Sequence, residues 1–146
     1  KVNNDDMLGR ATTEDEAKVE IEDTLEIELP QFYYWPYGIE YESYTLEPEA
    51  QTAIMQYLYN GDNVHLMIIA NVKNASLLAT SDFGSQIKEV KSELMDSINS
   101  IIWEVLEEGD QKPTYILQWE YKNVYYELSG KLSGTEAESI AKNIIY

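Results

Sequence analysis

The strongest indication of the fold is residues 52–70, TAIMQYLYNGDNVHLMIIA. Apolar and aromatic side chains alternate before and after a central turn-forming run, Asn60-Gly61-Asp62-Asn63. Strict alternation is typical of half-buried strands, and Asn-Gly is the preferred dipeptide of a tight hairpin turn. This stretch therefore predicts two antiparallel strands. Their inward side chains are Ala53, Met55, Tyr57 and Tyr59 on the first, and Val64, Leu66, Ile68 and Ala70 on the second.

Outward from this hairpin, three further segments have strand character. A second hairpin is expected from about Tyr115 to Ser129, with Lys122-Asn123 at its turn. Residues 39–42 alternate apolar and charged side chains. Residues 31–35, Gln-Phe-Tyr-Tyr-Trp, lie between Pro30 and Pro36, so an extended stretch or an edge strand is expected there. The core of the fold is therefore an antiparallel sheet.

Two helices are predicted by their first residues. Thr13 and Glu16 have the spacing of a capping box, and a helix over residues 14–25 follows, with Ala17, Ile21 and Leu25 on one face. Ser133 and Glu136 repeat the capping-box spacing. They predict a C-terminal helix whose apolar face is Ala137, Ile140, Ala141, Ile144 and Ile145.

Residues 87–107 are ambiguous, because their apolar side chains fit a helix as well as a strand; we favour a strand over 100–107. The predicted fold class is α+β, with an antiparallel β-sheet of about five to six strands and the N- and C-terminal helices packed on one face. Residues 1–12 are expected to be a flexible leader, and residues 13–146 a single domain.

Composition narrows the classes of function. The chain has 146 residues, 44% of them hydrophobic, so it is too apolar for a disordered segment despite a net charge of -17. That acidic excess argues against nucleic acid as a partner. The chain has no cysteine, which excludes disulfides and thiolate chemistry, and it has no apolar run long enough to span a membrane.

The search for catalytic motifs is negative, and no cofactor or metal is expected. His65 is the only histidine, and we interpret it as a partly exposed strand residue. Glu104, Glu120 and Glu127 are the candidates for a carboxylate-dependent glycan hydrolase, although solvated acidic faces are the favoured explanation of these side chains in a chain with 27 acids. Calcium is a lesser alternative at the loops 60–63 and 107–110, neither of which has the pattern of a calcium-binding loop.

The aromatic content is unusual, with twelve Tyr and three Trp against two Phe. Tyrosine and tryptophan have an apolar body and a polar tip, which suits a surface that binds a ligand. Within the aromatic-rich residues 32–44, the candidate binding residues are Tyr33, Tyr34, Trp35 and Tyr37. The alternative is that these rings only cover the sheet and fill space beneath the helices.

The C-terminal part resembles a known family. Residues 117–119 (Leu-Gln-Trp), residues 126–133 (Tyr-Glu-Leu-Ser-Gly-Lys-Leu-Ser) and the helix after them are similar to domain of unknown function 4367 of clostridia and related Gram-positive bacteria. Leu29-Pro30 and residues 34–38 (Tyr-Trp-Pro-Tyr-Gly) also fit, so the resemblance covers about residues 14–146. It implies an extracytoplasmic domain, often attached to a lipoprotein anchor or a membrane-spanning regulator, and it implies no reaction.

The expected function is therefore a non-enzymatic extracytoplasmic binding or sensory module of a bacterial envelope protein, with a glycan, peptide or protein as partner. The start at Lys1 fits a chain trimmed after an export signal, with membrane attachment only through an anchor outside this chain. The alternatives are the glycan hydrolase and a structural spacer domain.

Overall fold

The computed structural model describes residues 12–71 and 84–146, so the predicted leader, residues 1–12, lies outside the described residues except for Thr12. Two helices are described, α2 (Glu14–Leu25) and α4 (Gly134–Lys142). The strands are β1 (Gln31–Phe32), β2 (Glu40–Glu47), β3 (Thr52–Tyr59), β4 (Asp62–Ile69), β5 (Ser85–Lys91), β6 (Asn99–Val105), β7 (Thr114–Tyr121), β8 (Val124–Gly130) and β9 (Ile144–Ile145).

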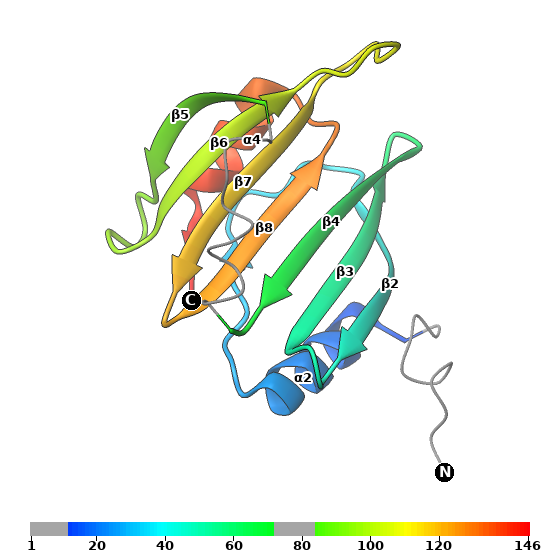
Figure 1. Ribbon diagram of the computed structural model, residues 1–146, viewed down its shortest axis with the longest axis vertical. Coiled ribbons are helices and arrows are strands. Elements are labelled where there is room, and N and C mark those ends of the chain that lie inside the picture. Colours follow the sequence, from blue (N-terminus) through cyan, green and yellow to red (C-terminus); the bar gives the residue numbers. More distant parts are fainter. Residues whose placement is uncertain (1–11, 72–83) are drawn as a thin grey trace.

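The main sheet is antiparallel and has seven strands in the order β2-β3-β4-β8-β7-β6-β5 (Figure 1). The predicted α+β class with an antiparallel sheet is confirmed, but the predicted count of five to six strands was too low. β5 was not predicted as a strand, because it is an exposed edge strand of mainly charged and polar side chains with one buried residue, Val90. β1 and β9 form a separate two-stranded sheet.

Both predicted hairpins are confirmed. β3 and β4 pair from Thr52↔Ile69 to Tyr59↔Asp62, leaving Asn60 and Gly61 as the turn. Both turn residues have positive φ, 53° and 83°, as this type of two-residue hairpin turn requires. β7 and β8 are joined in the same way by Lys122 and Asn123, with φ of 49° and 64°.

Helix α2 has the predicted boundaries and the predicted cap. The Thr13 hydroxyl accepts a hydrogen bond from the Glu16 backbone N–H (3.1 Å), and the Glu16 carboxylate accepts one from the Thr13 backbone N–H (3.0 Å). These bonds satisfy backbone donors that have no partner within the helix. The predicted face of Ala17, Ile21 and Leu25 is buried.

One hydrophobic core contains the buried side chains of both helices and of one face of the sheet. In Figure 1 both helices lie behind the sheet, α2 near β2 and α4 near β5, β6 and β7. The core side chains from the central strands include Met55, Leu66, Leu117 and Tyr126, which alternate with residues of the opposite face. This layer positions α2 over the first hairpin, where the candidate site is found.

The predicted C-terminal helix begins at the expected residue but is shorter than expected. It ends at Lys142, and Ile144 and Ile145 form strand β9, paired with Phe32 and Gln31. The prediction was wrong here because spacing along the chain cannot reveal a backbone partner more than one hundred positions away. Ile144 is nevertheless fully buried, so the prediction that it belongs to the hydrophobic core is confirmed.

Residues 87–107 contain two strands and no helix. β5 ends at Lys91 and β6 begins at Asn99, and the turn between them brings Ile98 into the core. The favoured strand over 100–107 is therefore confirmed in type, with β6 starting one residue earlier and ending at Val105.

Ser100 of β6 leads to a prediction about stability. Its side chain is fully buried, and within residues 12–71 and 84–146 its hydroxyl has no hydrogen-bond partner. A buried hydroxyl without a partner costs about 1–3 kcal/mol, so Ser100→Ala is expected to raise the free energy of unfolding by about 1 kcal/mol. Denaturant-induced unfolding measures the change.

Ser92 provides the matched control. It is equally buried, but its hydroxyl donates to the Ile144 carbonyl (2.6 Å) and accepts from the Leu94 N–H (3.2 Å). Ser92→Ala is therefore expected to destabilise the protein by about 1–2 kcal/mol. Equal effects of the same sign in the two variants would contradict this account.

Candidate functional site

The aromatic segment is held across the core face of the sheet by backbone pairing. β1 pairs with β9, and the Tyr33 N–H donates to the Asn143 carbonyl (2.9 Å). The four predicted binding residues then divide into two pairs. Tyr33 and Tyr37 are 68% and 100% exposed, whereas Tyr34 and Trp35 are half-buried and pack against the core.

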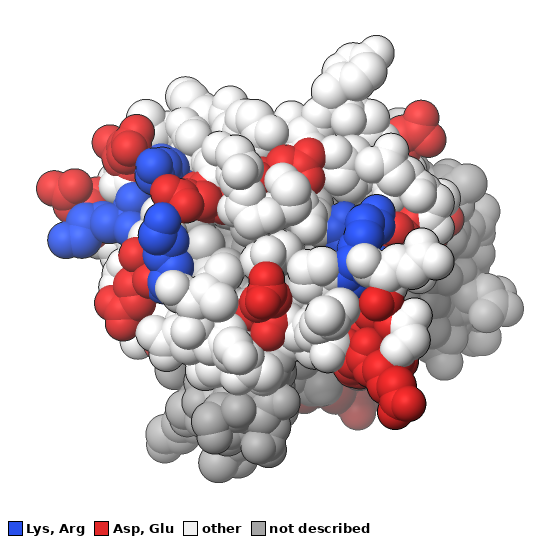
Figure 2. All heavy atoms as spheres, turned by 90° about the horizontal axis from the view of Figure 1, so that it is seen from above, with Lys and Arg blue, Asp and Glu red and all other residues white. Residues whose placement is uncertain are grey.

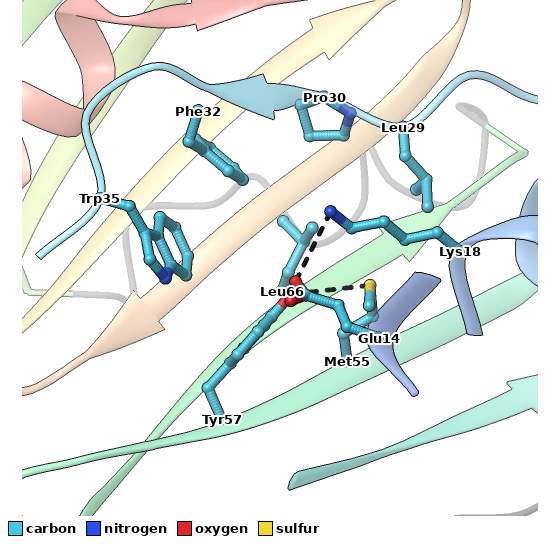
Figure 3. Close-up of a pocket in the computed structure, with 9 residues that line it drawn as sticks. All are labelled: Glu14, Lys18, Leu29, Pro30, Phe32, Trp35, Met55, Tyr57 and Leu66. Atoms are coloured by element: carbon cyan, nitrogen blue, oxygen red, sulfur yellow. Dashed lines mark hydrogen bonds and ion pairs between the residues drawn. The ribbon is translucent and has the colours of Figure 1, made fainter. Parts of the chain in front are cut away.

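A cavity of about 250 Å³ lies beneath this segment, between α2 and the first hairpin of the sheet (Figure 3). Its lining comes from three parts of the fold: α2, the stretch around β1, and the strands β3 and β4. The lining residues are Glu14, Lys18, Leu29, Pro30, Phe32, Trp35, Met55, Tyr57 and Leu66. Of the four predicted binding residues, Trp35 alone belongs to this set.

The walls of the cavity are aromatic and aliphatic. The Phe32 and Trp35 rings are stacked with centroids 4.8 Å apart, and Trp35 meets Tyr57 edge-to-face at 5.5 Å. Met55 and Leu66 are buried residues of β3 and β4. Figure 3 shows Phe32 and Trp35 on one side of the cavity and Lys18 on the other.

The rim is polar and comes mainly from α2. Glu14 and Lys18 form an ion pair of 3.5 Å, with side chains 38% and 39% exposed. The Tyr57 hydroxyl donates to the same Glu14 oxygen at 2.7 Å. Burial and the neighbouring Glu14 carboxylate raise the pKa of Tyr57, so Tyr57 stays protonated and remains a donor.

This arrangement can bind a small molecule. An apolar group would fill the aromatic interior, and a polar end would meet one carboxylate and one ammonium at the rim. Sequence reasoning found Trp35 but missed Glu14, Lys18, Met55 and Leu66. Glu14 and Tyr57 are 43 positions apart, and nothing in the sequence indicates that they meet.

The other residues considered from the sequence lie elsewhere. Glu104 pairs in register with the core residue Tyr115 and accepts its hydroxyl at 2.7 Å. Glu127 lies on the opposite face of the sheet, as does Glu120, its diagonal neighbour across β7 and β8. The structure therefore separates Glu104 from the other two candidate carboxylates.

A polar network on that opposite face contains Glu127. The Trp103 indole N–H donates to Gln118 (2.6 Å), and the Gln118 amide donates to the Tyr125 hydroxyl (2.6 Å). Tyr125 in turn donates to Glu127 (2.8 Å). His65 is half-buried on the same face, where burial lowers its pKa and the Glu127 charge opposes that shift. It is therefore mostly neutral at pH 7.

The lysines in the described part of the chain are largely paired with acids. Figure 2 shows blue and red side chains next to one another on the face seen from above. Ion pairs with N–O distances between 2.7 and 3.6 Å involve Lys18, Lys88, Lys112, Lys122, Lys131 and Lys142. Among the described residues, no cluster of three or more histidines or acids is arranged to hold a metal ion, and neither helix is long and apolar enough to cross a membrane.

The protein is an α+β domain in which helices cover one face of an antiparallel sheet. A small cavity with both apolar and charged lining residues lies between α2 and this sheet. The profile of the family described as "Domain of unknown function (DUF4367)" matches residues 29–144, and the chain belongs to this family. The resemblance expected from the sequence is thus confirmed. A search of curated proteins finds no match to this chain.

Proposed function

We propose that this protein is a non-enzymatic, extracytoplasmic binding module of a bacterial envelope protein, and that it binds a small ligand in the cavity beneath Trp35. The cavity is the observation that carries the proposal, because it combines an apolar interior with a polar, accessible rim. The resemblance to an extracytoplasmic family supports the location.

The lining of the cavity favours binding over the alternative of glycan hydrolysis. That chemistry needs two carboxylates about 5–10 Å apart in one cleft. Glu14 is the one carboxylate among the cavity-lining residues, so the cavity lacks the second carboxylate that this chemistry requires. A spacer domain, the other alternative, has no need of an aromatic cavity with an accessible rim.

A thermal-shift titration tests the proposal. Wall glycans, muropeptides, short peptides and small aromatic compounds are added to the protein in turn. A ligand that binds only the folded state stabilises it by about 2.7 kcal/mol at 100 times its Kd, which raises Tm by roughly 5–10 °C for a domain of this size. We expect such a saturable shift with at least one small compound that has an apolar group.

Two matched variants locate the site. Trp35→Ala removes a cavity wall and is expected to abolish the shift, while Trp35→Phe keeps a ring and retains part of it. Tyr37→Ala removes a fully exposed ring that does not line the cavity and should leave the shift unchanged. A shift that is lost in Tyr37→Ala and kept in Trp35→Ala would place binding on the exposed surface and refute the cavity.

A further inference from the structure

The size of the cavity limits what it can hold. A 150 Å³ apolar cavity accommodates benzene, and pockets for drug-sized ligands have about 300–1,000 Å³. At about 250 Å³, this cavity suits one ring or one branched aliphatic group with a short substituent. A glycan chain or a folded peptide would be too large to enter it.

The interior selects for an apolar group. Phe32, Trp35 and Tyr57 present ring edges and faces, and Met55 adds a thioether that packs well against aromatic rings. The Tyr57 hydroxyl is turned toward Glu14 and Met55, where it already has partners at 2.7 and 3.9 Å. The interior therefore offers packing and little hydrogen bonding.

The rim carries both signs of charge within a few ångströms. Glu14 Oε2 lies 3.5 Å from Lys18 Nζ and also accepts the Tyr57 hydroxyl. The Glu14 carboxylate is therefore positioned by β3 as well as by its own helix, α2. An exposed pair of this kind contributes little to stability. A ligand that brings its own opposite charges can therefore insert between Glu14 and Lys18 with little loss.

The net charge of the chain argues against a purely anionic ligand, since a protein at -17 repels anions as they approach. A purely cationic ligand would meet Lys18 at the rim. A zwitterion avoids both penalties, because its carboxylate meets Lys18 and its ammonium meets Glu14. Its two charges must also lie close together, as Glu14 and Lys18 do.

We propose that the cavity binds a free α-amino acid with an aromatic or branched aliphatic side chain, such as phenylalanine or leucine. The side chain fills the interior, the α-ammonium donates to Glu14, and the α-carboxylate accepts from Lys18. This inference rests on the proposed binding function and narrows it to one chemical class of ligand.

Isothermal titration of the full chain tests the inference with four probes that share one ring. They are L-phenylalanine, L-phenylalaninamide without the carboxylate, 3-phenylpropanoate without the ammonium, and benzyl alcohol without either charge. L-phenylalanine is expected to bind about tenfold tighter than each singly charged probe, because each lost partner removes a charge-assisted hydrogen bond.

Three variants assign the charges. Glu14→Gln should bring the affinity for L-phenylalanine down to that for 3-phenylpropanoate, and Lys18→Gln should bring it down to that for L-phenylalaninamide. Asp23→Asn removes one exposed carboxylate from the same helix without touching the cavity, and it should change none of the affinities. Tm values of all three variants confirm that each one is folded.

The outcomes separate this inference from the proposed function. If benzyl alcohol or a singly charged probe binds as tightly as L-phenylalanine, the zwitterion is refuted while the binding cavity stands. If none of the four probes binds, the amino-acid ligand is refuted. If a wall glycan or muropeptide then gives a saturable shift that Trp35→Ala does not abolish, the cavity is refuted as the site as well.

Discussion

Replacing Trp119 with alanine is expected to lower the free energy of unfolding by about 3–5 kcal/mol. The Trp119 ring is 2% exposed and stacks on Tyr126 with centroids 5.7 Å apart. Its indole N–H donates to the Tyr146 hydroxyl at 2.8 Å, which ties the last residue of the chain to β7. Removal of the ring leaves a cavity and a half-buried Tyr146 hydroxyl without this donor, and urea denaturation measures the loss.

Two further variants control for this effect. Trp119→Phe keeps a ring but loses the bond to Tyr146, so a smaller loss of about 1–2 kcal/mol is expected. Tyr37→Ala removes a fully exposed ring and is expected to stay within about 0.5 kcal/mol of the parent. Similar stabilities of Trp119→Ala and Tyr37→Ala would contradict the packing described for the C-terminal strands.

Replacing Gly130 with alanine is expected to destabilise the protein by about 1–3 kcal/mol. A Cβ at this position would lie 2.6 Å from Cγ2 and 3.1 Å from Cβ of Val64, its register partner on β4. Val64 is fully buried and β-branched, so it cannot rotate away freely. Thermal and urea unfolding both report the loss.

Space created at Val64 should relieve this clash. The double variant Val64→Ala/Gly130→Ala is expected to lose less stability than the sum of the losses in the two single variants. The difference is expected to be about 0.5 kcal/mol or more. Strict additivity would show that Gly130 is required for some reason other than the contact with Val64. The glycine belongs to the Tyr-x-Leu-x-Gly strand that carries the family resemblance, so the contact gives that motif a packing role.

The elements that could be predicted are those with local signals. The Asn60-Gly61 turn and the capping boxes at Thr13 and Ser133 depend on neighbouring residues alone, and all three occur as expected. β5 and β9 could not be predicted in this way. β5 is an edge strand with little apolar content, and β9 exists because Ile144 and Ile145 pair with the distant β1.

The candidate site was predictable in its aromatic half only. The aromatic residues between Pro30 and Pro36 led to the prediction of Trp35 as a binding residue, and Trp35 lines the cavity. The charged half comes from α2, where Glu14 and Lys18 have the spacing of an ordinary surface ion pair. Only the packing of α2 on β3 brings them to the cavity.

An NMR titration that follows the indole N–H signals of the three tryptophans tests most directly whether the cavity binds a free α-amino acid. The chain has Trp35 at the cavity, Trp103 on the opposite face of the sheet and Trp119 in the core. On addition of L-phenylalanine, we expect a saturable shift of the Trp35 signal and an unchanged Trp103 signal. A Trp35 signal that stays constant up to the solubility limit of L-phenylalanine, or a saturable shift at Trp103 alone, would contradict binding in this cavity.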